Sequence, residues 1–194
     1  MFIHPTADVS ERSTIGEATR IWHQAQVMPD ARIGAACTLG KGCFVGTGSI
    51  VGNKVKIGNY AEIFGAVIED EAFIGPLACL IEDSLPRSTN LDGSRRELGD
   101  WTKAPARICR GASVGAGSII LPGIIVGAWS MTAAGSVVHR NVPPHVLVGG
   151  NPARSIGFVC RCGARLIDDS PTPTCVCGSR YARLLDGLTT TQGI

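Results

Sequence analysis

A period of six residues runs through most of this chain. An aliphatic side chain recurs at every sixth position from Ile3 to Ile63, and a small or modest side chain follows each one four residues later. This period fits neither the helical turn of about 3.6 residues nor the two-residue alternation of an ordinary strand. It is typical of a solenoid, in which each unit buries its apolar face only against its neighbours. We therefore predict an all-β fold, a parallel β-helix in which each hexad forms a short strand and a corner, and three hexads close one triangular coil. The aliphatic positions are Ile3, Val9, Ile15, Ile21, Val27, Ile33, Leu39, Val45, Val51, Ile57 and Ile63.

The repeat is interrupted by one long segment. It slips by one residue after Ile63, continues to Leu80, and gives way to residues 83–107, which carry many charges and prolines and have no period. Hexads resume at Ile108. A loop of roughly 25 residues inside a regular solenoid is usually functional or disordered. Trp101 and the mixture of basic and acidic residues favour a functional loop.

Composition and charge exclude several classes of protein. The 194 residues are 44% hydrophobic and 18% charged, which suits one main domain with a good core. A net charge of +2 that is not concentrated in any segment indicates neither a nucleic-acid nor a membrane partner. The N-terminal segment lacks the basic and apolar regions of a signal peptide, and no apolar run approaches the ~18 residues of a membrane span. We expect a cytoplasmic protein.

The last hexads carry motifs of a known family. AAGSVV at 133–138 and NVPPHVLVGGNPAR at 141–154, together with the repeat and the long loop, resemble the hexapeptide-repeat acyltransferases. The resemblance implies a left-handed parallel β-helix, against the usual right-handed preference of parallel crossovers. It also implies acetyl-CoA as acyl donor, which the closing GNPAR specifically indicates. The family implies a homotrimer with three active sites, each between neighbouring β-helices and roofed by the loop.

Shorter segments are similar to one branch of that family. They are RIWH at 20–23, IGP at 74–76, PRS at 86–88 and GNPARSIGF at 150–158. This branch acetylates the 3-amino group of nucleotide-linked amino sugars, typically UDP-2-acetamido-3-amino-2,3-dideoxyglucuronate. The resemblance covers nearly the whole chain and implies an acetyl-CoA-dependent N-acetyltransferase.

Departures from the branch leave other functions open. Gln26 stands where relatives tend to carry a second histidine, and Glu62 and Glu82 add negative charge to a site that should receive an anionic sugar nucleotide. One alternative is a transferase of the same fold acting on another amine or a hydroxyl, such as a natural-product intermediate. The other is a non-catalytic β-helix scaffold.

The pantetheine arm of CoA is expected along the C-terminal coils. Small residues there let the backbone approach the arm, and arginines can neutralise phosphates because guanidinium forks match phosphate oxygens. Tight corners and solvated arginines are the alternative explanation. The candidate CoA-binding residues are Arg110, Ala116, Gly117, Ala133, Ala134, Gly135, Arg140, Pro152 and Arg154.

The acceptor site is expected at the base of the long loop. Asp83 stands in LIEDSLPR where relatives typically carry asparagine. A carboxylate there can orient the acceptor ammonium and receive its proton. The alternatives are a loop acid that faces water and a mechanism in which positioning of the substrates suffices without a base. Glu82 and His23 complete the candidate catalytic set. The candidate substrate-binding residues are Asn59, Arg87 and Trp101.

The cysteines separate by position. Cys37 and Cys43 occupy the small inward place of consecutive hexads and are expected to pack in the core. CRCG at 160–163 and CVCG at 175–178 resemble the two knuckles of a zinc ribbon, although the usual knuckle has two residues between its cysteines. A disulfide pair is the rival interpretation, which a reducing cytoplasm disfavours. The predicted ligands of a structural zinc ion are Cys160, Cys162, Cys175 and Cys177.

The predicted domain organisation follows from these patterns. Residues 1–157 form the β-helix acyltransferase domain, and residues 158–194 form a small zinc-ribbon-like tail. His139 and His145 lie near the expected CoA end and are assigned structural roles.

Overall fold

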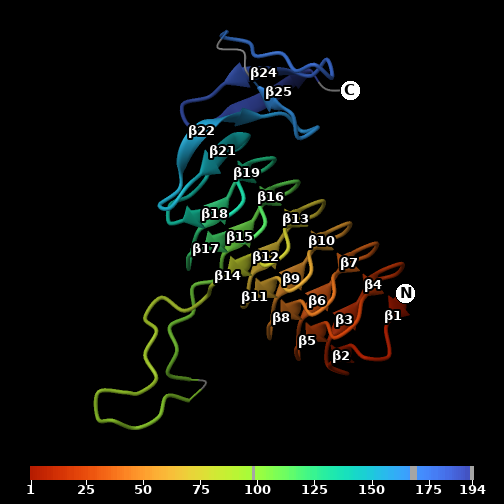
Figure 1. Ribbon diagram of the computed structural model, residues 1–194, viewed down its shortest axis with the longest axis vertical. Helices are drawn as coiled ribbons and strands as arrows, with labels where there is room; N and C mark the ends of the chain where they lie inside the picture. Colours follow the sequence, from red (N-terminus) through yellow and green to blue (C-terminus); the bar gives the residue numbers. More distant parts are fainter. Residues whose placement is uncertain (98, 167–169, 193–194) are drawn as a thin grey trace.

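The protein is described by a computed structural model that covers residues 1–97, 99–166 and 170–192. Residues 98, 167–169 and 193–194, which belong to the predicted loop and tail, lie outside the described residues. The predicted all-β fold is confirmed: within the described ranges the chain forms a three-sided parallel β-helix and no helical segment (Figure 1). None of the residues described belongs to a helix long and apolar enough to cross a membrane.

Strands of two residues stack into three parallel sheets, one on each face of the β-helix. Successive coils pair in register, so that Ile21 lies between Ile3 and Leu39. The first sheet begins with β1 (Phe2–Ile3), β4 (Arg20–Ile21), β7 (Thr38–Leu39), β10 (Lys56–Ile57), β13 (Phe73–Ile74), β16 (Ser113–Val114) and β19 (Met131–Thr132). The second sheet contains β2 (Asp8–Val9), β5 (Gln26–Val27), β8 (Phe44–Val45), β11 (Glu62–Ile63), β14 (Cys79–Leu80), β17 (Ile119–Ile120) and β20 (Val137–Val138). The third sheet contains β3 (Thr14–Ile15), β6 (Arg32–Ile33), β9 (Ile50–Val51), β12 (Val67–Ile68), β15 (Arg107–Ile108) and β18 (Ile125–Val126).

The core is built from the two inward positions of each hexad. The aliphatic residue is the second of its strand and points inward, and Ile57 and Leu80 have no exposed surface. The small residue fills the narrow space near the corner, as Ala61 does. The predicted core positions of Cys37 and Cys43 are confirmed, since both are buried. Burial raises the pKa of the Cys43 thiol to about 12, so this thiol is a packing group.

Corners of the coils need backbone conformations that most residues avoid. Gly42 has a φ of +63°, and a Cβ there would collide with the ring of Tyr60 in the next coil. Asparagine side chains close other corners: Asn53 Oδ1 accepts a hydrogen bond of 2.9 Å from the N–H of Ala35, one coil below. Stacked corners therefore satisfy each other's backbone groups along each edge of the β-helix.

The slip in the repeat is absorbed at one corner. Gly65 turns there with a φ of +62°, and Ala66 takes the buried small position. Val67, which an unbroken period places in that position, instead pairs with Ile50 of the coil below and is half-buried. The repeat then continues without loss of core contacts.

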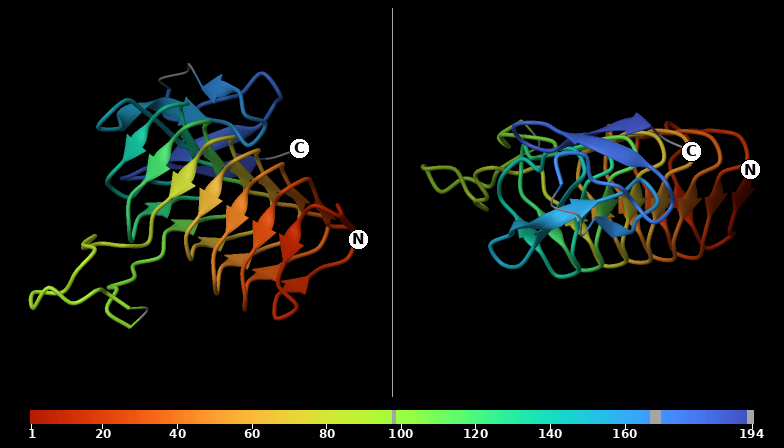
Figure 2. Two further views of the ribbon diagram at one scale, coloured as in Figure 1. Left: turned by 60° about the horizontal axis from the view of Figure 1, so that its bottom comes forward. Right: turned by 90° about the horizontal axis from the view of Figure 1, so that it is seen from above.

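The predicted loop leaves the β-helix between β14 and β15 and projects from its side (Figure 2). Its base is pinned to the coils by backbone hydrogen bonds. The N–H of Ala104 donates to the carbonyl of Glu82 over 2.6 Å, and the N–H of Gly123 donates to the carbonyl of Ala104 over 2.8 Å. Asp83 and Lys103 form an antiparallel bridge beside them. The first residues of the loop are therefore fixed against the coils.

The first strands after the last coil extend the first sheet. β21 (Val146–Gly149) pairs parallel with β19, and β22 (Arg154–Val159) and β23 (Arg165–Leu166) continue that sheet in antiparallel order. β24 (Arg180–Arg183) and β25 (Leu188–Gln192) form a separate hairpin. Phe158 packs against both the β-helix core and a small second cluster in the tail, at the boundary proposed for the two domains.

The burial of each leucine predicts how much it contributes to the free energy of unfolding of the β-helix. Replacing the fully buried Leu80 by alanine should lower the free energy of unfolding by about 2–5 kcal/mol, because it removes apolar contacts and leaves a cavity. The same substitution at the fully exposed Leu91 should change it by less than ~0.5 kcal/mol. Denaturant titration of both variants measures the difference, and equal effects would contradict the assigned core.

Candidate active site

One edge of the β-helix joins the first and second sheets and holds several predicted site residues. Along this edge each corner carbonyl accepts a hydrogen bond from the next coil, beginning with Gly42 N–H to His23 O at 2.9 Å and ending with Gly135 N–H to Ala116 O at 2.8 Å. The structure thus brings His23 and Asn59 into line with small residues of the last coils. The predicted residues on this edge are His23, Asn59, Ala116, Gly117, Ala133, Ala134 and Gly135.

The side chains at the start of this edge are engaged with each other. The rings of His23 and His4 stack with centroids 3.5 Å apart, and Trp22 lies beside them. The pKa of His4 is lowered by loss of hydration and by the charge of His23. Asn59 Oδ1 accepts a hydrogen bond of 2.9 Å from the N–H of Lys41. Asn59 therefore closes a corner, whereas His23 is exposed.

A second edge, between the second and third sheets, carries the base of the long loop and an open pocket of about 450 Å³. Asp83 lines this pocket, and its Oδ1 accepts a hydrogen bond of 3.1 Å from the N–H of Leu85. Glu82 forms an ion pair with Lys103, with Oε1 and Nζ 3.0 Å apart. Of the two predicted carboxylates, Asp83 is the one that faces the pocket. The other lining residues are Ile81, Ser84, Pro86, Leu121, Pro122, Ile124 and His139.

His139 is a site residue that the sequence analysis treated as structural. It lines the pocket of Asp83 and also a neighbouring pocket of about 210 Å³, which contains Arg140 and Arg154. Nε2 of His139 lies 3.2 Å from Nη1 of Arg154, a guanidinium nitrogen that can only donate. Nδ1 is buried and has no hydrogen-bond partner among the described residues. The Asp83 pocket therefore adjoins a pocket lined by arginines.

The predicted residues of the closing turn gather around this second pocket. Pro152 lies in the turn between β21 and β22, where the N–H of Ala153 donates to the carbonyl of Val137 over 2.9 Å. The guanidinium of Arg154 also donates to the carbonyl of Ala153 over 3.0 Å. This turn is thus tied to β20, and it sets Arg154 beside His139.

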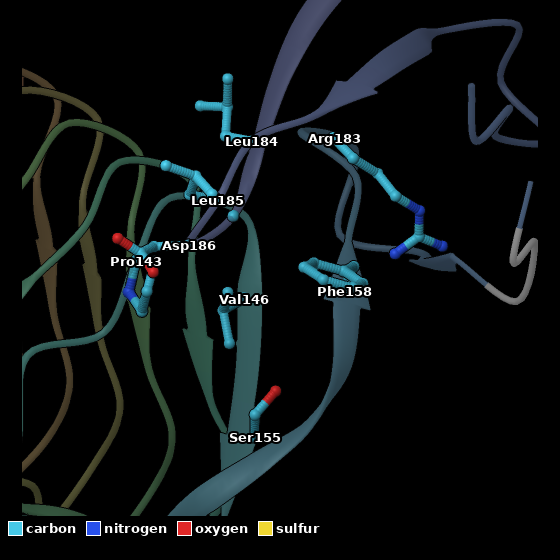
Figure 3. A pocket seen from close by; sticks show the side chains of 9 residues that line it. Pro143, Val146, Ser155, Phe158, Arg183, Leu184, Leu185 and Asp186 are labelled. Carbon is cyan, nitrogen blue, oxygen red and sulfur yellow. The ribbon is translucent and has the colours of Figure 1, made fainter. Parts of the chain in front are cut away.

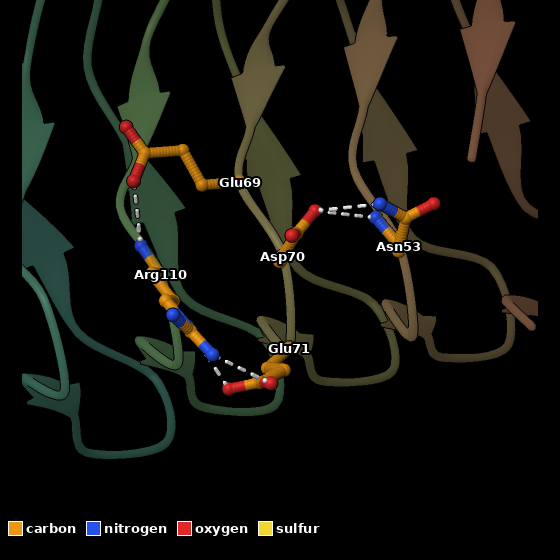
Figure 4. A network of polar contacts seen from close by, with 5 residues as sticks. All are labelled: Asn53, Glu69, Asp70, Glu71 and Arg110. Carbon is orange, nitrogen blue, oxygen red and sulfur yellow. Dashed lines mark hydrogen bonds and ion pairs between the residues drawn. The ribbon is translucent and has the colours of Figure 1, made fainter. Parts of the chain in front are cut away.

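Arg110 lies on a different edge, between the third and first sheets (Figure 4). Its guanidinium donates two hydrogen bonds to Glu71, of 2.9 and 3.1 Å, and its N–H donates to Glu69 over 2.9 Å. These bonds hold the pKa of the Glu71 carboxyl below its usual range. Asp70, between the two glutamates, accepts from the N–H of Asn53 over 2.7 Å. The structure therefore separates Arg110 from Arg140 and Arg154 and engages it in an ion pair.

Arg87 and Trp101 remain within the projecting loop. Arg87 is exposed and donates to the neighbouring carbonyl of Pro86 over 2.8 Å. The guanidinium of Arg96 lies over the ring of Trp101, 5.4 Å from its centroid. Neither predicted substrate-binding residue lines the Asp83 pocket.

Comparisons with known proteins find similar acetyltransferases. No family model matches the chain. A dTDP-3-amino-3,6-dideoxy-alpha-D-galactopyranose 3-N-acetyltransferase of Aneurinibacillus thermoaerophilus is 46% identical over 79 residues, which are 41% of this chain and 41% of that protein. The chain thus spans less than half the length of the curated relatives it matches.

Two solved structures are similar over most of the β-helix. One is a variant of AntD, an N-acyltransferase from Bacillus cereus in complex with dTDP and coenzyme A, with a TM-score of 0.65, 19% identity and coverage of 77% of this chain and 85% of that one. This likeness shows the left-handed β-helix fold. The other is a hexapeptide-repeat-containing acetyltransferase from Vibrio cholerae in complex with acetyl coenzyme A, with a TM-score of 0.52, 28% identity and coverage of 66% and 70%. Over about two thirds of its length the chain is thus similar to a hexapeptide-repeat-containing acetyltransferase.

Four cysteines come together in the C-terminal tail. The sulfur atoms of Cys160, Cys162, Cys175 and Cys177 all lie within 4.8 Å of one another. Two sulfur–sulfur contacts join the CxCG segments, with 3.5 Å between Cys160 and Cys177 and 3.6 Å between Cys162 and Cys175. All four are free thiols. This donor set fits a tetrahedral thiolate site.

The two CxCG segments have the same backbone geometry. Cys160 N–H donates to the carbonyl of Ala164 and Gly163 N–H donates back to Cys160, each over 2.9 Å. Cys175 repeats both bonds at the same distance with Ser179 and Gly178. The two glycines have φ of +89° and +90°, a region that a side chain disfavours. One residue between the cysteines therefore suffices to form two equivalent knuckles.

Neighbouring groups shift the pKa values of the cluster thiols in opposite directions. The hydroxyl of Tyr181 lies 2.9 Å from the sulfur of Cys160, and burial together with this contact raises the pKa of Tyr181 to about 12. Hydrogen bonds from the hydroxyl and N–H of Ser179 lower the pKa of Cys177 to about 6. Burial instead raises the pKa of Cys175 to about 12. A cation is needed to stabilise four thiolates at once.

Proposed function

We propose that this protein is an acetyl-CoA-dependent N-acetyltransferase acting on the amino group of a nucleotide-linked 3-amino sugar. The carrying observation is the pair of adjoining pockets, one with the carboxylate of Asp83 at the loop base and one with Arg140 and Arg154 at the GNPAR turn. The relative from Aneurinibacillus is named for acetylation of a 3-amino group on a dTDP-linked sugar, which supports this class of acceptor.

The proposed chemistry needs an unprotonated amine beside a thioester. Asp83 would accept a proton from the acceptor ammonium, and the freed nitrogen would attack the thioester carbonyl. The carbon–sulfur bond then breaks while the nitrogen gives up a second proton, which protonates the sulfur of CoA, and the proton held by Asp83 passes to solvent. Arg154 would bind the phosphates of acetyl-CoA. It would also hold His139 in position beside the bound acetyl-CoA. Alignment of donor and acceptor supplies much of the remaining acceleration.

Thermal shift and thiol release test the proposal together. Acetyl-CoA should raise the melting temperature because it binds the native state, and a dTDP- or UDP-linked 3-amino sugar should release CoA thiol. Release only with simple amines or hydroxyl compounds would favour the alternative acceptor classes. Absence of both stabilisation and release would favour the non-catalytic scaffold.

A homotrimer is part of the proposal, because the candidate residues lie on two separate edges of one β-helix. A site between neighbouring subunits would bring the edge of His23, Ala116 and Gly135 close to another subunit's loop base. Outward isoleucines on the strands also offer apolar surface for such contacts: Ile50, Ile119 and Ile125 are 46%, 36% and 42% exposed. Sedimentation at micromolar concentration should give a trimer. A monomer would contradict an intersubunit site.

Arg154→Ala should raise the KM for acetyl-CoA by about tenfold with little change in kcat, because the lost contact binds ground state and transition state alike. Arg20→Ala, on an exposed strand position of the second coil, is the matched control and should leave the KM unchanged. Steady-state kinetics at saturating acceptor measure both. An unchanged KM in Arg154→Ala would remove this residue from the CoA site.

We also propose that the four-cysteine cluster holds a structural zinc ion. Two equivalent knuckles and four converging thiols support it, and four protein ligands leave no open position for catalysis. Free thiols at this spacing fit a reducing compartment, so we place the protein in the cytoplasm.

A further inference from the structure

The tail contributes a hairpin tip to an open pocket of about 330 Å³ (Figure 3). Arg183 at the end of β24 and residues 184–187, which connect β24 to β25, form one wall. Val146 of β21 and Phe158 of β22 form the opposite side. The pocket therefore combines residues of the last coil with residues far along the tail, which no repeat pattern connects.

The hairpin tip is anchored, although its leucines are exposed. The N–H of Leu184 donates to the carbonyl of Gly187 over 2.8 Å, and the N–H of Leu188 donates to the carbonyl of Pro144 over 3.2 Å. A Cβ on Gly187 would collide with the same Pro144 carbonyl, so the approach requires glycine. Leu184 and Leu185 remain 53% and 104% exposed. A fixed turn thus presents two apolar side chains to solvent beside a pocket.

This pocket is continuous with the proposed CoA site. It shares Pro143, Val146 and Ser155 with the pocket that contains Arg140 and Arg154. One long ligand can therefore occupy both. Positive charge extends into the new pocket through Arg183, whose guanidinium lies 5.4 Å from the centroid of the Phe158 ring. Asp186 is the acidic residue in its lining.

We propose that this pocket receives the adenine nucleotide end of acetyl-CoA. The inference rests on the proposed acetyltransferase function and extends it to the tail. Adenine has flat apolar faces, which match Leu184, Leu185 and the ring of Phe158. Its amino group is a donor for the carboxylate of Asp186. The ribose phosphates are anions that fit between Arg183 and the arginines of the adjoining pocket.

The test compares CoA with pantetheine, which lacks the nucleotide. Leu185→Asp places a negative charge at a fully exposed position, so the fold should be retained. It should raise the Kd for CoA by about tenfold or more, equivalent to ~1.4 kcal/mol, in isothermal titration calorimetry. The affinity for pantetheine, and kcat/KM with acetyl-pantetheine, should not change. Leu91→Asp, on the exposed loop, is the control and should leave both ligands unaffected.

The outcomes separate this inference from the function on which it rests. If the unaltered protein binds neither CoA nor pantetheine, the acetyltransferase proposal fails. If it binds CoA and Leu185→Asp binds it equally well, only the nucleotide pocket is overturned. Equal weakening of both ligands in Leu185→Asp also overturns the pocket, because the effect would then not depend on the nucleotide.

Discussion

Replacing Asp83 by asparagine should lower the turnover number by about 100-fold or more, because a positioned base contributes 10²–10⁴-fold. The amide oxygen can still accept the hydrogen bond that Asp83 Oδ1 receives from the N–H of Leu85, so the loop base should keep its geometry. The substitution thus removes the proton acceptor and retains the shape of the pocket. Turnover is measured with a confirmed amine acceptor at saturating acetyl-CoA.

The matched control is Asp92→Asn, in the same loop. Asp92 is exposed and accepts a hydrogen bond of 2.9 Å from the N–H of Ser94, and it does not line the pocket. The Asp92→Asn variant should have the same turnover number as the unaltered protein. Full activity of Asp83→Asn would show that positioning of the substrates suffices without a base.

Loss of a cysteine ligand should unfold the tail. We expect about one zinc per chain in protein purified without chelator, and less than ~0.2 equivalents in Cys175→Ser. The buried cluster of the tail is Cys160, Leu166, Cys175, Tyr181 and Leu188, so two of its five members are proposed ligands. Structural zinc contributes apparent binding energies of about 10–16 kcal/mol in zinc-finger peptides, which is far more than such a cluster supplies alone. Hydrogen exchange in β24 and β25 should therefore rise sharply.

Cys109→Ser is the control for the zinc experiment. Cys109 is a half-buried free thiol on the third sheet side of the β-helix and lies outside the cluster. Its zinc content and exchange protection should match the parent. Metal-free parent protein with a fully protected tail would argue for packing of free thiols without zinc.

The sequence alone determined the architecture of the β-helix. A hexad is a local unit, and each coil repeats the one below, so the inward positions of Ile57, Leu80 and Cys43 follow from the period without knowledge of distant contacts. The two CxCG knuckles could also be predicted from the sequence, because each knuckle is closed by hydrogen bonds within a few residues. The end of the repeat also identified the long loop.

The tertiary structure decided how the candidate site residues are grouped. Arg110 pairs with Glu71 across the inserted loop, 39 residues apart in the chain, and so lies on another edge from Arg154. His139 faces the pocket of Asp83 because the loop base folds onto the coils above it. The hairpin that carries Leu185 belongs to the cysteine-rich tail and is hydrogen-bonded to Pro144 of the last coil. Such groupings depend on how insertions and chain reversals place one corner beside another, and a local period carries no information about that.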